Sequence, residues 1–124
     1  MTVPHDDEAT QREICARHAV EFVPADACLK VGIAKGAMSG VMPIHGLRLW
    51  PTETSCGCYV WAGDEPSDDP DFFEPVHVAH LRDVCAAIVP YLGLPPGSRL
   101  VVADGYDDVW RDEKLLDEAP GPQP

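Results

Sequence analysis

The fold is decided by the stretch Cys56-Gly57-Cys58-Tyr59-Val60-Trp61-Ala62-Gly63. Its centre, Cys58-Tyr59-Val60-Trp61, is rich in the aromatic and β-branched residues that favour strands, and Gly63 is placed to end such a strand. We therefore expect a strand here, at the centre of a β-sheet.

A helix is expected next along the chain, over residues 75–91. Pro75 suits the first turn of a helix, where its missing N–H costs no hydrogen bond. Apolar residues then recur at steps of three and four and predict one buried stripe: Val78, Leu81, Cys85, Ile88 and Leu92. Pro90 weakens the last turn, and Gly93 followed by Pro95-Pro96-Gly97 ends the helix.

The other elements are predicted from the spacing of apolar residues, which recurs every three to four residues in helices and every two in strands. An amphipathic helix is expected over residues 8–22, ending before Pro24. Strands are expected at residues 30–34, near 41–50 and at 99–103, and the last turns at Asp104-Gly105 into a partner strand at 108–111. The order of elements predicts an α+β fold with a small, mostly antiparallel sheet of about four or five strands, an N-terminal helix, and one main helix at about 75–91.

The length and composition suit one domain. A chain of 124 residues can bury one modest core, and 45% hydrophobic residues is ordinary for a folded protein. We expect a single α+β domain over residues 1–118. Residues 119–124, Ala-Pro-Gly-Pro-Gln-Pro, contain no core-forming residue and are expected to be a flexible tail.

The charge of the chain restricts its partners. The formal net charge is -12, and residues 64–118 carry fourteen acidic side chains against four basic ones. Such a field repels the phosphates of nucleic acids and anionic lipid headgroups, and it attracts basic partners. We expect no nucleic acid and no membrane as partner, and a basic protein instead; acidity that serves solubility alone is the plain alternative.

The compartment is predicted from what the sequence lacks. No apolar run is long enough to span a bilayer, and the first residues lack the basic and apolar regions of a signal peptide. We expect a cytoplasmic protein whose five cysteines are reduced thiols.

Two places in the sequence carry side chains that could bind a metal ion. His77 and His80 stand three apart and share a helix face, and with Cys56 and Cys58 they could hold a zinc ion. Cys-x-Cys is not the usual zinc knuckle, so a partly buried His77 and an exposed His80 without metal are expected. The acidic residues 64–71 lack the spacing of a calcium loop. We expect no metal and no cofactor.

Catalytic motifs are missing from the sequence. It contains no Gly-x-Ser-x-Gly elbow and no phosphate-binding Gly-Lys-Ser/Thr, and Cys85 falls on the apolar stripe. These observations predict a protein that is not an enzyme.

Aromatic and acidic residues alternate where a binding surface is expected. Tyr106 and Trp110 flank Asp107 and Asp108 at a turn and sheet edge, a combination typical of interaction hot spots for basic proteins. The candidate partner-binding residues are Asp64, Glu65, Asp68, Asp69, Asp71, Tyr106, Asp107, Asp108 and Trp110.

Four segments carry a resemblance to a known family. They are Gly57 to Glu65, Asp68-Asp69-Pro70-Asp71-Phe72-Phe73, Tyr91 to Gly97, and Tyr106-Asp107-Asp108-Val109-Trp110. Together they resemble bacterial immunity-protein family thirty-three of the polymorphic toxin systems, over about residues 28–116. The chain departs from the family's Gly-Trp hallmark at Cys58. The resemblance implies a cytoplasmic protein that binds and neutralises a cognate toxin.

Three hypotheses for the function follow. The first is an immunity protein that neutralises a cognate toxin through its acidic surface. The second is a small metal-binding enzyme or sensor that uses His77 and His80. The third is an interaction domain that has no toxin as partner.

Overall fold

The computed structural model describes residues 5–26, 28–39, 41–63 and 72–117. Helix α1 spans His5–Arg17 and is followed by strand β1, Lys30–Ala34, and the short helix α2, Lys35–Met38. Strands β2, β3 and β4 span Ile44–Arg48, Ser55–Ala62 and Phe73–His77. Three helical pieces come next: η1, Val78–His80; α3, Leu81–Cys85; and η2, Ala86–Tyr91. Strands β5, Ser98–Ala103, and β6, Tyr106–Arg111, and the 3-10 helix η3, Glu113–Asp117, complete the order.

The strands form one sheet in the order β4-β1-β3-β2-β5-β6. Every neighbouring pair is antiparallel except β1 and β3, which run parallel. The α+β class and the central position of β3 are thereby confirmed. The expected four or five strands were too few, because residues 73–77 form an additional strand, of which 75–77 were predicted as the start of the main helix.

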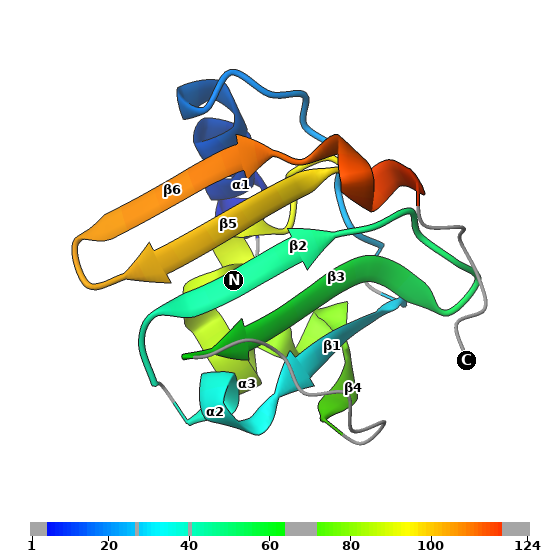
Figure 1. Cartoon of the computed structure of the whole chain (residues 1–124), viewed down its shortest axis with the longest axis vertical. Coiled ribbons are helices and arrows are strands. Elements are labelled where there is room, and N and C mark those ends of the chain that lie inside the picture. Colours follow the sequence, from blue (N-terminus) through cyan, green and yellow to red (C-terminus); the bar gives the residue numbers. More distant parts are fainter. Residues whose placement is uncertain (1–4, 27, 40, 64–71, 118–124) are drawn as a thin grey trace.

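The sheet and the helices form two layers. Helices α1 and α3 lie behind the sheet in Figure 1, and no described helix lies in front of it. Alternate residues of the strands point to the helices and fill the core; in β2 these are Ile44, Gly46 and Arg48. Ile14 and Cys15 of α1 and Leu81, Ile88 and Leu92 of the helical segment close the core from the other side. The opposite face of the sheet, which we call the open face, carries the remaining alternate residues.

The main helical segment begins at Val78, so the predicted start at Pro75 was wrong. Pro75 lies in β4, an edge strand, and pairs with Gly32 of β1. Because an edge strand pairs on one side only, it accepts a proline as readily as the first turn of a helix does. The segment is also less regular than predicted, since two of its three pieces are 3-10 helices and Pro90 lies inside the last.

Helix α1 ends at Arg17 and not at Phe22. Ala19 adopts a φ of 57°, and the Val20 N–H donates to the Cys15 carbonyl at 2.9 Å, which closes the helix end. Phe22 keeps contact with the helix through Arg12, whose guanidinium lies 4.3 Å from the centre of the Phe22 ring. The spacing that suggested a longer helix therefore reflects packing across the end of α1.

Strand β3 carries a β-bulge at its start. The pairing with β1 advances from Lys30–Ser55 to Gly32–Tyr59, so two extra residues fit into β3. Gly57 takes a φ of +90°. Cys56 and Cys58 are two residues apart on β3, and both lie in the core.

Candidate partner-binding surface

The nine candidate binding residues fall into two groups. Asp64, Glu65, Asp68, Asp69 and Asp71 lie outside the described residues, so their role stays a prediction. Tyr106, Asp107, Asp108 and Trp110 all lie on β6, the edge strand at the other end of the sheet.

The β5–β6 hairpin fixes which way each of these four side chains points. Gly105 has a φ of +70°, which suits the tight turn, and the register pairs Ala103 with Tyr106 and Leu100 with Val109. Tyr106, Asp108 and Trp110 share the open face, and Asp107 lies on the helix side. The aromatic side chains remain 57% and 44% exposed at Tyr106 and Trp110, which leaves both available to a partner.

Asp107 makes internal contacts that join three elements. Its carboxylate accepts hydrogen bonds from the Arg17 guanidinium of α1 and from the Tyr91 hydroxyl of η2, the latter at 2.5 Å. His18 Nε2 lies 3.9 Å from the same oxygen, is buried, and has no hydrogen-bond partner among the described residues. Burial, and then the bond to Asp107, raises the pKa of Tyr91 to about 12. Asp107 thus holds the hairpin against the helices.

We expect Tyr91→Phe to lower the free energy of unfolding by about 1–2 kcal/mol, because the variant removes a hydrogen bond to a half-buried carboxylate. Arg17→Gln is the control: Arg17 is 54% exposed, so its loss is expected to cost less than about 1 kcal/mol. Urea unfolding of both variants at pH 7 measures the contrast. A larger loss for Arg17→Gln would contradict this assignment.

The same bond gives a pH dependence of known sign. In the unfolded chain a tyrosine titrates near pH 10, whereas native Tyr91 titrates at about 12. A raised pKa favours the protonated native form, so the contribution is complete below pH 10 and is lost as the pH rises toward 12. The stability difference between the wild type and Tyr91→Phe is therefore expected to shrink between pH 10 and 12.

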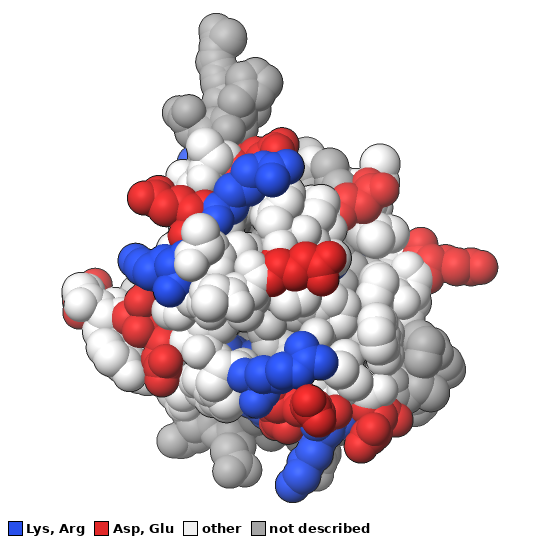
Figure 2. Space-filling model, turned by 90° about the horizontal axis from the view of Figure 1, so that it is seen from above, with Lys and Arg blue, Asp and Glu red and all other residues white. Residues whose placement is uncertain are grey.

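Charges on the β6 side of the molecule are mixed. Figure 2, seen from that side, shows acidic and basic side chains interspersed around uncharged surface. Several of the basic groups are paired: Arg99 Nε lies 2.6 Å from Asp112 Oδ2, and Arg111 Nε lies 3.5 Å from Glu113 Oε2. Within the described ranges, Asp104 and Asp108 make no ion pair. They are the acidic groups of the hairpin that remain free for a basic partner.

Two clefts flank α1. One, of about 380 Å³, lies between α1 and the β5–β6 hairpin, with Arg17, Tyr91 and Asp107 among its walls. The other, of about 450 Å³, lies between α1 and the segment 78–92. Neither brings together a nucleophile, a base and an orienting group among the residues described.

The metal hypothesis gains no support from the geometry. His77 and His80 are both exposed, which corrects the partly buried position expected for His77, and their ring centres lie 6.2 Å apart. Cys56 and Cys58 are buried on β3. The described part of the chain contains no group of three His, Cys, Asp or Glu side chains that could hold a metal ion.

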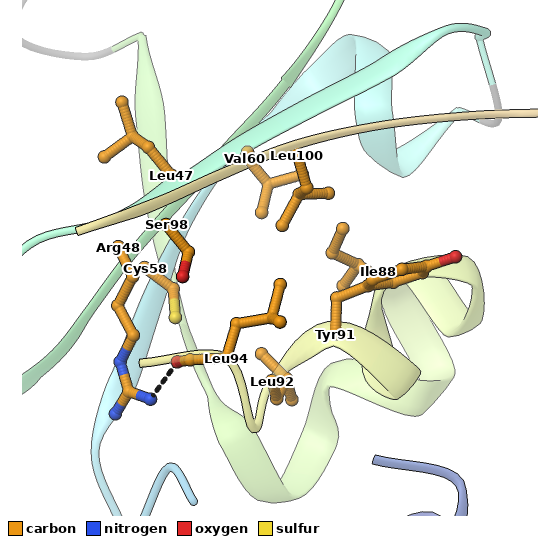
Figure 3. A pocket seen from close by; sticks show the side chains of 11 residues that line it. Leu47, Arg48, Cys58, Val60, Ile88, Tyr91, Leu92, Leu94, Ser98 and Leu100 are labelled. Atoms are coloured by element: carbon orange, nitrogen blue, oxygen red, sulfur yellow. Dashed lines mark hydrogen bonds between the residues drawn. The ribbon is translucent and has the colours of Figure 1, made fainter. Parts of the chain in front are cut away.

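Sequence reasoning missed a buried arginine beside the two thiols. Arg48 is 5% exposed, and its guanidinium donates to the carbonyls of Cys56, Val23 and Leu94 at 3.1, 2.5 and 2.7 Å. Figure 3 shows Arg48 next to Cys58, at a cavity of about 10 Å³ with mostly apolar walls. Such a volume holds about one water molecule and no larger ligand.

The two thiols influence each other through this arrangement. The hydrogen bond between Cys56 and Cys58 lowers the pKa of Cys56 and raises the pKa of Cys58, and the Arg48 charge favours both thiolates.

Alternation along 44–48 could have revealed Arg48, because it falls on the same face as the apolar Ile44.

The described residues form no helix long and apolar enough to span a bilayer. Comparison with curated proteins and with solved structures gave no significant match. The model of the Imm33-like domain, in contrast, matches residues 10–112, which include every strand of the sheet and most of α1. The chain belongs to the Imm33-like domain family.

Proposed function

We propose that this protein is a cytoplasmic immunity protein that neutralises a cognate bacterial toxin by binding it, without catalysis. Membership of the Imm33-like family supports an immunity role. The observation that carries the proposal is the outward row Tyr106, Asp108 and Trp110 on an edge strand, with both aromatic side chains exposed. The acidic residues of segment 64–71 are proposed to add to the same attraction.

The partner is proposed to be a basic protein surface. An aromatic side chain provides a large contact area at low entropic cost, and a free carboxylate beside it selects a cationic neighbour. The net charge of -12 adds long-range attraction, which speeds association with a basic toxin and weakens as salt is added.

The test is binding and protection against the toxin domain encoded beside this gene. We expect Trp110→Ala to weaken binding about 30-fold or more, the effect of a hot-spot residue worth about 2 kcal/mol. Asp108→Lys is expected to slow association and reduce its salt dependence. Both variants should lower the survival of cells that express the toxin.

Asp83→Lys is the matched control, since it makes the same change of charge at an exposed position on α3, in the other layer. It is expected to bind and protect as the wild type does. If the wild-type protein neither binds the toxin domain nor protects cells, the immunity function is refuted. Asp107 is unsuitable for this test because its substitution disturbs the contacts with Tyr91 and Arg17.

A further inference from the structure

The open face of the sheet is unusually apolar for a face that no described helix covers. Two rows of outward residues cross this face along the register of the paired strands. One row consists of Trp110, Arg99, Leu47, Tyr59, Gly32 and Pro75, and the other of Asp108, Val101, His45 and Trp61. Antiparallel sheets with one solvated face usually place polar residues there. Arg99, Asp108 and His45 are the polar members of these rows.

Aromatic side chains of the open face pack against one another over part of it. The Trp61 ring stacks on His45 at 5.7 Å and meets the edge of Phe73 at 6.4 Å, while Tyr59 meets Phe73 at 5.3 Å. Trp61 is only 7% exposed. The half of the sheet that holds β3 and β4 is thus closed by its own aromatic side chains.

The other half stays open. Trp110 is 44% exposed, and Leu47 and Val101 beside it are half-buried. Leu47 pairs with Arg99, and Arg99 with Trp110, so these side chains are neighbours across β2, β5 and β6. Arg99 is paired with Asp112 at 2.6 Å, whereas Asp108 makes no ion pair with a described residue. We call this set the open-face patch: His45, Leu47, Arg99, Val101, Asp108 and Trp110.

We propose that the toxin docks on the open-face patch, so that the interface extends from β6 across β5 to β2 rather than following the sheet edge alone. The inference rests on the proposed immunity function and assigns its contact surface. The partner it fits is a protein with an apolar centre that covers Leu47 and Val101 and a basic side chain that meets Asp108.

Charge selects this occupant over a second copy of the chain. Two copies would each bring a net charge of -12 and an unpaired Asp108 into the same contact, which like-charge repulsion opposes. A basic protein, in contrast, is attracted both by the net charge of the chain and by the Asp108 carboxylate.

The experiment compares lysine substitutions on the two layers. Leu47→Lys and Val101→Lys place a positive charge in the patch, whereas Ala87→Lys places one at an exposed position of the helical layer. The probe is the neighbouring gene's toxin domain carrying an inactivating substitution. We expect both patch variants to bind it about 30-fold more weakly or worse, and Ala87→Lys to bind as the wild type does.

Two variants on different strands guard against a folding defect in one of them, and circular dichroism confirms the fold of each. If the wild type binds the toxin domain but both folded patch variants bind equally well, the docking surface is wrong while the immunity function stands. If the wild type does not bind at all, the function itself fails. Sedimentation at micromolar concentration gives a third outcome, because a dimer broken by Leu47→Lys would assign the patch to self-association and overturn the proposal.

Discussion

Gly57→Ala is expected to lower the free energy of unfolding by about 3–5 kcal/mol. The added Cβ would lie 2.2 Å from the Leu49 carbonyl oxygen and 2.9 Å from its carbon, both backbone atoms that cannot move aside without displacing β2 from β3. The Leu49 N–H donates to the Gly57 carbonyl at 2.8 Å and holds the strands together at this point. A φ of +90° adds backbone strain for any residue with a side chain.

Gly63→Ala separates the steric clash with Leu49 from the backbone strain of a positive φ. Gly63 has a similar φ of +77°, but no described residue beyond its chain neighbours has an atom within 4 Å of the position of its Cβ, so only the strain of about 1 kcal/mol is expected. Urea unfolding and the thermal midpoint of the two variants measure the difference. For a domain of this size we expect a loss of about 10–15 °C for Gly57→Ala and a few degrees for Gly63→Ala. Equal losses would contradict the close approach of Leu49.

The bulge at Gly57 illustrates what the sequence could not predict. The composition of residues 56–63 correctly predicts a strand and its central place in the sheet. The conformation of Gly57, however, is set by the Leu49 carbonyl of the neighbouring strand, and a contact between strands leaves no trace in a local pattern. Pro75 was misplaced for a related reason, since the first turn of a helix and an edge strand accept proline equally well.

The candidate surface was predictable only in part. The turn at Asp104-Gly105 and the alternation after it predict an edge strand with exposed Tyr106 and Trp110. The same alternation puts Asp107 on the other side, yet its bonds to Tyr91 and Arg17 depend on how far α1 and η2 reach across the sheet. The open-face patch was not foreseen because its residues come from three strands whose order only the fold defines.

Arg48→Met is expected to destabilise the protein by about 2–4 kcal/mol. Two effects oppose each other: the variant removes a buried charge, which by itself is favourable, and it leaves two buried carbonyls and one partly buried carbonyl without their cationic donor. No carboxylate among the described residues pairs with Arg48. Because hydrogen bonds from a charged donor contribute about 1.5–3 kcal/mol each, the loss of three outweighs the gain from removing one charge.

The bonds of Arg48 explain why this loss should spread through the fold. Its guanidinium joins the Val23 carbonyl after α1, the Cys56 carbonyl in the bulge and the Leu94 carbonyl after η2, three segments that are distant in the sequence. Arg48→Lys keeps the charge but cannot reproduce the planar arrangement of donors, so it should remain destabilised by at least about 2 kcal/mol. Arg111→Met, at an arginine that is 55% exposed, should cost less than about 0.5 kcal/mol. If Arg48→Lys were as stable as the wild type in urea, charge alone would suffice, and the three carbonyl bonds would not be what holds these segments together.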